Sequence, residues 1–312
     1  MVLLLQYMLL FASVLALVAL GGCFSEHSGV INLGLEGVMV IGALGGALVL
    51  KYMPVGSPAI LIIILTVIGA VLCGALYSSL LGIAAIKFNA DQTLVGTAMN
   101  MLATAVASVL VKAINLSEDS SNTSSVVTYI DNKPALTLKI GGFEFNWFML
   151  LALLAVIGAY ILLYKTKFGL RLMACGENPQ AADSVGINVY KMRWAGVLLS
   201  GILGGLGGIA YITAGSSWTF ETGVAGYGFL ALAVMIFGQW KPQRIILAAL
   251  LFGFFRALGS VYSGIDWLAA MSIPSTIYNL MPYIISLIVL MFSSRNSAAP
   301  KSEGIPYDKG SR

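Results

Sequence analysis

The feature that most constrains this chain is a series of apolar runs, each long enough to cross a lipid bilayer. A helix needs about 20 apolar residues to span a hydrocarbon core about 30 Å thick. The sequence therefore predicts an all-α integral membrane protein with about nine transmembrane helices. We expect them at roughly 2–22, 30–50, 59–86, 93–113, 147–164, 194–214, 224–240, 244–263 and 275–293. The runs at 30–50 and 224–240 are short and rich in glycine, so we expect one or both to be broken.

The composition excludes several other classes of protein. Only 10% of the 312 residues are charged, against about 25% in soluble domains. No basic patch of the kind that binds nucleic acid is present. Cys23, Cys73 and Cys175 lack CxxC spacing, and with the single histidine, His27, they do not form a metal-binding pattern. We therefore expect no disulfide framework, no metal site, no cofactor and no nucleic-acid partner.

The positions of lysine and arginine predict the orientation, because short cytoplasmic loops are enriched in both residues. With nine spans, four of these residues fall on one side and twelve on the other, and Arg256 lies inside a span. The smaller set is Lys51, Lys112, Lys133 and Lys139. The larger set is Lys87, Lys165, Lys167, Arg171, Lys191, Arg193, Lys241, Arg244, Arg295, Lys301, Lys309 and Arg312. The N-terminus is then outside and the C-terminus cytoplasmic.

The same count divides the chain into one membrane domain and a tail. Residues 1–293 form a single transmembrane domain, with an external loop at 114–146 and a cytoplasmic loop at 165–193. The external loop contains a stretch from Val126 to Ile140 that favours β structure. The cytoplasmic tail, 294–312, is polar, and we expect it to fray.

The cytoplasmic loop contains its own helix signals. Asn178 suits an N-cap, Pro179 suits the first helical position, and Gly186 can supply a left-handed stop. A helix of about two turns is therefore predicted between them. The small residues Ala181 and Ala182 would allow another surface to approach closely. On these signals alone, a capped helix resting on lipid headgroups is an equal alternative to a docking element.

This loop resembles that of permease subunits in bacterial ABC importers of the branched-chain amino acid, ribose and nucleoside group. The family pattern, T-x-x-G-x-x-x-x-A-x-G-x-N-x-x-A-A-x-x-x-G-I, is matched at Thr166, Gly169, Ala174, Gly176, Asn178, Ala181, Ala182, Gly186 and Ile187. The resemblance implies that the loop holds a coupling helix that docks on a cytoplasmic ATPase. The implied coupling residues are Gly176, Glu177, Asn178, Pro179, Ala181, Ala182 and Gly186.

Further segments resemble the nucleoside branch of this family, and the shorter permease of the two that its members often pair. They begin at Ser28, Asp91, Gly226 and Phe237, and His27 and Cys175 depart from the usual pattern. The resemblance implies a second, longer permease, an extracytoplasmic binding protein, and a substrate pathway at the interface of the two permeases. No GxxxxGK[ST] motif is present, so ATP hydrolysis is expected on another polypeptide and this chain is not expected to be an enzyme.

Polar residues inside the spans are the candidates for the pathway. Asn32 and Glu36 share a helix face, and a carboxylate at that depth should face protein or water. It either contacts substrate or clamps a broken helix. Thr93, Thr97, Asn100, Thr104 and Ser108 form one stripe, which either lines a hydrophilic path or packs helices together. Tyr227 and Phe229 could stack on a nucleoside base.

Two further features leave alternatives open. Arg256 lies within a span and needs a partner, for which Glu36, Glu221 and Asp266 are candidates. Together, Glu36 and Arg256 would also suit an ion-coupled secondary transporter, whose uptake would collapse with the ion gradient. Another simple sugar, such as ribose or galactose, is the alternative substrate.

The run Gly201–Gly208 has small residues four apart, which predicts close helix packing.

Overall fold

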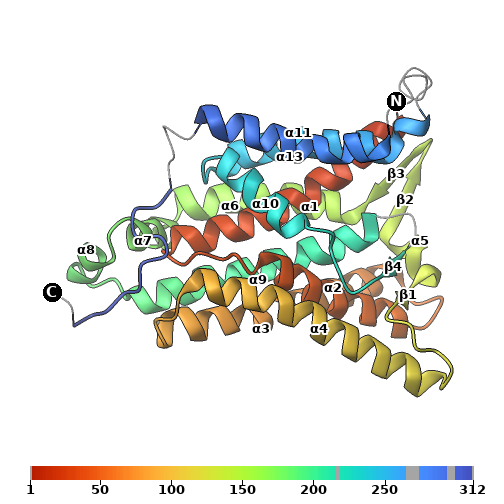
Figure 1. Ribbon diagram of the computed structural model, residues 1–312, viewed down its shortest axis with the longest axis horizontal. Coiled ribbons are helices and arrows are strands. Elements are labelled where there is room, and N and C mark those ends of the chain that lie inside the picture. Colours follow the sequence, from red (N-terminus) through yellow and green to blue (C-terminus); the bar gives the residue numbers. More distant parts are fainter. Residues whose placement is uncertain (1, 215–217, 265–273, 294–298, 311–312) are drawn as a thin grey trace.

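Long helices that run side by side along the longest axis build this protein, as the computed structural model shows (Figure 1). The structure describes residues 2–214, 218–264, 274–293 and 299–310. Seven described helices are long and apolar enough to cross a membrane. They are α1 (Val2–His27), α2 (Leu35–Tyr52), α3 (Ala59–Gly82) continued by η1 (Ile83–Lys87), α4 (Gln92–Glu118), α6 (Trp147–Lys165), α9 (Val189–Ala214) and α11 (Pro242–Val261).

Two of the nine predicted spans are not among these seven helices of the described residues. The run expected at 224–240 forms α10 (Tyr227–Phe237), whose 11 residues measure about 16 Å, too short to cross the bilayer core. The run at 275–293 forms α13 (Ser275–Ser293), a 19-residue helix that contains Pro282 and packs beside α11. The expectation that the run at 224–240 is short is therefore confirmed.

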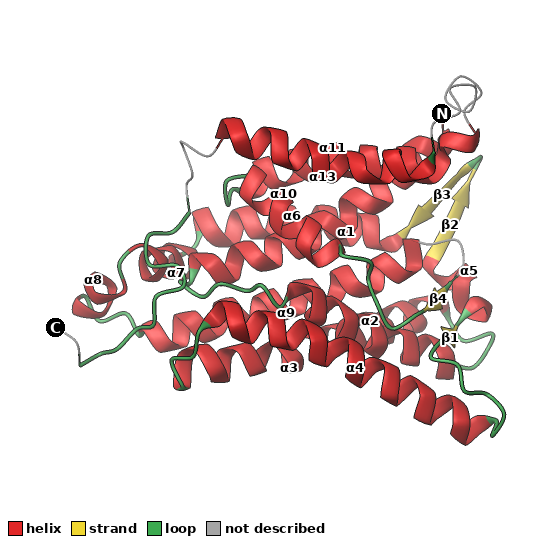
Figure 2. Ribbon diagram, viewed as in Figure 1, coloured by secondary structure: helices red, strands yellow, loops and turns green. Residues whose placement is uncertain are grey.

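The prediction of an all-α fold is incomplete, because short strands lie at one end of the helices (Figure 2). β1 (Val127–Thr128) pairs antiparallel with β4 (Thr219–Phe220), and β2 (Thr137–Ile140) pairs antiparallel with β3 (Phe143–Asn146). The first pair joins segments about 90 residues apart in the chain, which local sequence patterns do not reveal. Between β1 and β2 lie η2 (Ile130–Asn132) and α5 (Lys133–Leu136).

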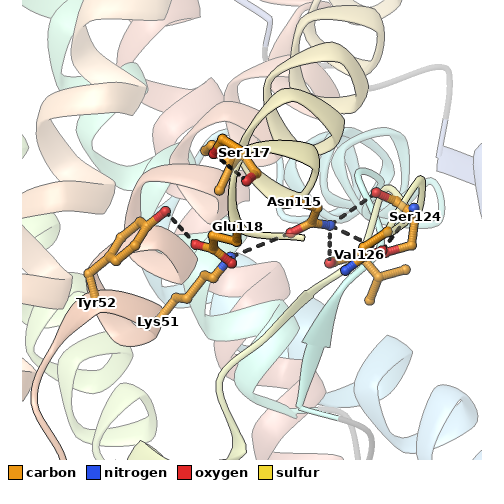
Figure 3. Close-up of polar contacts among 9 residues, drawn as sticks. Lys51, Tyr52, Asn115, Ser117, Glu118, Ser124 and Val126 are labelled. Atoms are coloured by element: carbon orange, nitrogen blue, oxygen red, sulfur yellow. Dashed lines mark hydrogen bonds and ion pairs between the residues drawn. The ribbon is translucent and has the colours of Figure 1, made fainter. Parts of the chain in front are cut away.

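Polar contacts fix the ends of α2 and α4 beside these strands, as Figure 3 shows. Lys51 Nζ lies 2.7 Å from Glu118 Oε2, and the Tyr52 hydroxyl donates to Glu118 Oε1 over 2.9 Å. The Asn115 amide donates to the carbonyl oxygens of Ser124 and Val126, both at 3.0 Å. Helix α4 therefore continues to Glu118, beyond the expected start of the external loop at residue 114, and the loop folds back on it.

The core lies where α9 packs against α1, α2 and α3 (Figure 1). The predicted close packing of the Gly201–Gly208 run is confirmed. A methyl group at Gly208 would overlap the Met39 carbonyl of α2, and one at Gly201 would lie 2.7 Å from the Gly74 carbonyl of α3. Because these glycines have no side chains, the backbones of three helices approach closely.

The end opposite the strands carries two short helices and the C-terminal segment. These helices are α7 (Lys167–Glu177) and α8 (Pro179–Ser184). The expectation of a frayed tail is wrong for residues 299–310, where the described chain lies against this end and Tyr307 is only 3% exposed. Residues 294–298 and 311–312 of the predicted tail lie outside the described residues.

Candidate functional sites

The break between α1 and α2 is a tightly bonded turn rather than an open polar surface. Asn32 is fully buried, its amide nitrogen donates to Ser200 Oγ over 2.9 Å, and its Oδ1 accepts from the Gly34 N–H at 3.1 Å. Asparagine suits this position because its side chain can satisfy a nearby backbone group in a turn. In this conformation Asn32 joins the turn to α9 and is not available to a ligand.

Glu36 clamps the beginning of α10. Its Oε1 accepts from the Gly226 N–H at 2.8 Å, and its Oε2 accepts from the Gly228 N–H at 2.6 Å. The first N–H groups of a helix lack partners within the helix, and a negative charge there is favourable. In this conformation Glu36 therefore holds the beginning of α10, as the second of its two alternatives expects, and its role in transport stays a prediction.

Asn100 performs a similar task on α2. Its Oδ1 accepts from the Gly37 N–H at 2.8 Å, and its Nδ2 donates to the Leu33 carbonyl at 2.9 Å. These bonds tie α4 to the residues that begin α2, so the amide is already engaged with backbone groups. Asn100 and Glu36 therefore hold the beginnings of α2 and α10 through their backbone groups.

The remaining members of the α4 stripe lie on its surface. Thr93, Thr97 and Thr104 are exposed, and the hydroxyls of Thr97 and Thr104 donate to carbonyls of their own helix. At the strand end of the stripe, Ser108 donates to the Thr222 hydroxyl over 3.2 Å. The stripe thus forms a weakly polar surface on α4. This surface could contact a second protein or line a hydrophilic path.

A cavity of about 220 Å³ lies near the beginning of α10. Its lining combines three aromatic rings with two charged side chains: Phe11, Tyr211, Ile212, Thr219, Glu221, Gly223, Tyr227 and Arg256. The Tyr211 and Tyr227 rings lie 4.5 Å apart between centroids. Phe229, two residues along α10, is 49% exposed. Sequence reasoning did not identify Phe11 or Tyr211, because they resemble ordinary apolar helix residues.

Arg256 has an aromatic contact that sequence reasoning missed. Its Nε donates to the Tyr227 hydroxyl over 2.7 Å, and its guanidinium lies 5.2 Å from the Tyr227 ring centroid. Tyrosine can therefore serve an intramembrane arginine both through its oxygen and through its ring. Asp266, one of the predicted partners, lies outside the described residues.

Helix α8 forms as its caps predict. The Asn178 side chain accepts from the Ala181 N–H at 3.0 Å, Pro179 occupies the first helical position, and Gly186 has φ of +84°. The turn is closed by the Ile187 N–H, which donates to the Ala182 carbonyl at 3.1 Å. These local bonds explain why a helix of only six residues begins and ends where the sequence predicts.

The other predicted coupling residues divide between exposed and buried positions. Glu177 and Ala181 are exposed, whereas Ala182 is 4% exposed and packs within the protein. Gly176 is buried, and a side chain there would overlap the His27 carbonyl at the end of α1. Only Glu177, Asn178, Ala181 and Gly186 of this set are open to a partner in this conformation.

Sequence reasoning missed α7, which precedes α8. Thr166 caps it, since its Oγ1 accepts from the Gly169 N–H at 3.2 Å. The signal was present as apolar residues on one face, including the buried Leu172 and Cys175. Two lysines and an arginine in this region give it the composition of a polar loop. Burial raises the pKa of the Cys175 thiol to about 11, against the opposing effect of the Arg193 guanidinium.

Comparisons with known proteins assign the chain to a family. The family model described as the permease component of branched-chain amino acid transport systems matches residues 4–293. The nucleoside ABC transporter permease protein NupC of Lactococcus lactis is 40% identical, over 97% of this chain and 95% of that protein. The guanosine ABC transporter permease protein NupQ of Bacillus subtilis is 39% identical, over 97% of this chain and 96% of that protein.

A second permease of Bacillus subtilis, the guanosine ABC transporter permease protein NupP, is 24% identical over 87% of this chain and 75% of that protein. The stronger matches extend over nearly the whole of both chains, and the family model includes every helix from α1 to α13. The chain is therefore a multi-pass membrane protein that belongs to the permease family of ABC transporters.

Proposed function

We propose that this chain is the pore-forming subunit of an ABC importer for nucleosides in the cell membrane. The observation that carries the proposal is identity of about 40% with two permeases, one named for nucleosides and one for guanosine, over nearly the full chain. The exposed end of the bundle that carries α8 supports it, because a short capped helix between two spans can receive a separate ATPase.

The proposed arrangement has nine membrane segments, with the N-terminus outside and the C-terminus in the cytoplasm. Residues 1–293 then form one permease domain, and α10 enters the membrane without crossing it alone. The distribution of lysine and arginine supports this orientation, since Lys165 ends α6 and Lys167 and Arg171 lie in α7, at the end proposed to be cytoplasmic. Helix α8 would dock on an ATPase subunit, with ATP hydrolysis confined to that partner.

We further propose a longer second permease and an external binding protein as partners. Bacillus subtilis has two guanosine permeases similar to this chain, and NupP is the one that this chain covers less completely. The exposed residues Thr93, Thr97 and Thr104 of α4 and Phe229 of α10 would line the path. The bonded residues Asn32, Glu36, Asn100 and Tyr227 would hold its wall in place, with Tyr227 also bordering the cavity.

Reconstitution tests this proposal. The chain would first be purified from its native membranes in mild detergent, and the co-purifying proteins identified by mass spectrometry. Proteoliposomes that contain the complex should take up labelled guanosine only when two conditions are met. ATP must be present on the side of the membrane that carries the ATPase subunit, and the binding protein must be present on the other side. A complex whose ATPase lacks the P-loop lysine is the control.

Other outcomes would overturn parts of the proposal. Uptake of ribose or galactose without guanosine uptake would replace the substrate class and leave the permease assignment intact. Guanosine uptake by this chain alone that collapses with the proton or sodium gradient would refute the ATP-driven mechanism. It would then support the ion-coupled alternative, in which Glu36 and Arg256 are relay groups.

A further inference from the structure

The C-terminal segment at residues 299–310, named here the strap, lies across the end of the bundle that carries α7 and α8 (Figure 1). The strap is bonded directly to the junction between these helices. The Ser302 N–H donates to the Gly176 carbonyl at 2.8 Å, and the Ser302 hydroxyl donates to the Glu177 carbonyl at 3.2 Å. These are the last two residues of α7, immediately before the cap of α8.

The strap also contacts α9 and the turn that follows α1. The Gly304 N–H donates to the Gly29 carbonyl at 3.2 Å. Arg193, which is 1% exposed, donates from Nη2 to the Ile305 carbonyl at 3.0 Å and lies 5.9 Å from the Tyr307 ring centroid. Burying a guanidinium is costly unless its N–H groups have partners. The strap supplies one of these partners, the Ile305 carbonyl. Removing the strap would therefore either expose the Arg193 guanidinium to solvent or leave its Nη2 buried without this acceptor.

An apolar contact completes the attachment. Tyr307 is 3% exposed and belongs to one cluster with Cys175 of α7, Ala182 of α8 and Val189 of α9. Its ring also meets Tyr190, with centroids 5.2 Å apart. A single side chain of the strap therefore joins three helices. Helix α8 has only six residues, and its buried Ala182 belongs to this cluster.

We propose that the strap is a positioning element for the coupling helix, which holds α8 against α1 and α9. When the ATPase moves α8, both long helices then move with it. Without the strap, α8 could shift by itself and leave the long helices in place. This inference rests on the proposed function, because it assigns the ATPase as the source of the movement. Within the strap, Ser302 and Tyr307 are the positioning residues.

A thiol assay reports whether the strap is seated without reference to transport. In a Cys23→Ser, Cys73→Ala chain, Cys175 is the remaining cysteine, and it is fully buried beside Tyr307. Its reaction with a maleimide in the assembled complex should be slow. A stop codon at position 299 or Tyr307→Ala should accelerate it by about tenfold or more, which corresponds to about 1.4 kcal/mol. Tyr307→Phe keeps the ring and should remain slow. Lys309→Ala removes only a long ion pair of 3.9 Å between an exposed lysine of the strap and Asp183 of α8, so its effect should be much smaller than that of Tyr307→Ala.

The functional assay separates positioning from binding. In the same complexes, Tyr307→Ala should retain the ATPase subunit and its basal hydrolysis. It should lose most of the stimulation by loaded binding protein and reduce guanosine uptake about tenfold, and Tyr307→Phe should restore both. Wild-type stimulation and uptake without the strap would refute the proposal, as would equal protection of Cys175 with and without it. Loss of the ATPase subunit while Cys175 stays protected would also refute it. If the unmodified complex transports no guanosine, the proposed function fails instead, and the thiol result stands separately.

Discussion

Glu36 offers the sharpest test of the site. Glu36→Ala removes the acceptor of two N–H groups at the start of α10, at 2.8 and 2.6 Å, and Gly228 is buried. Each buried donor left without a partner costs about 1–3 kcal/mol. Because Gly226 is only half-buried, we expect a total loss of about 2–4 kcal/mol in the free energy of unfolding. Unfolding by SDS in mixed detergent micelles measures this loss.

The conservative variant distinguishes a clamp from a relay. Glu36→Gln retains an oxygen acceptor and should be less destabilised than Glu36→Ala, with guanosine uptake preserved once protein amounts are matched. Thr97→Val, on the exposed face of neighbouring α4, provides a control whose stability should be unchanged. A Glu36→Gln protein of normal stability that transports nothing would refute the clamp and indicate a role for the titrating carboxyl itself.

Three further predictions address packing, coupling and pH. Gly208→Ala should sharply reduce the amount of folded protein, because its methyl group would overlap a carbonyl of α2. Gly158→Ala is the control, since a methyl group there has open space and should be tolerated. Fluorescence-detected gel filtration compares the two variants. Ala182→Arg should abolish guanosine uptake while the protein remains in the membrane, because it disrupts the seat of α8, and wild-type uptake would contradict this. Burial raises the pKa of Glu303 to about 7 from its ordinary 4.5. The protonated carboxyl therefore favours the bound strap over the detached strap. This stabilisation is complete below pH 4.5 and is lost as the pH rises through 7. Maleimide labelling of Cys175, taken relative to a Glu303→Gln chain at each pH, should therefore rise over this interval and then level off.

Local patterns in the sequence predicted the helices well because the bilayer imposes a simple rule on them. The expected runs at 59–86 and 147–164 differ by one residue from the observed Ala59–Lys87 and Trp147–Lys165. Helix α8 was also predicted, since its caps at Asn178 and Gly186 are bonded within a few residues. In each case the determining interactions are short-range or depend on composition alone.

The features that sequence reasoning missed depend on contacts between distant residues. The strap has the polar composition of a frayed tail, yet Arg193 lies 112 residues before its partner Ile305. Likewise, the Tyr227 hydroxyl meets Arg256 only because α10 and α11 pack together. The role of Glu36 remained open for the same reason, since its partners at Gly226 and Gly228 are specified by the tertiary fold.

The clamp between Glu36 and α10 also constrains the order of events during synthesis. Gly226 follows Glu36 by 190 residues, so α2 enters the membrane long before its partner has been made. At about 5–20 residues per second, the ribosome needs about 10–40 s to complete that interval. Throughout this time the carboxyl must be held by water, by lipid headgroups or by the insertion machinery. Helix α2 therefore cannot reach its final set of contacts until translation has passed α10, which leaves a long interval in which quality-control proteases can recognise the unfinished protein.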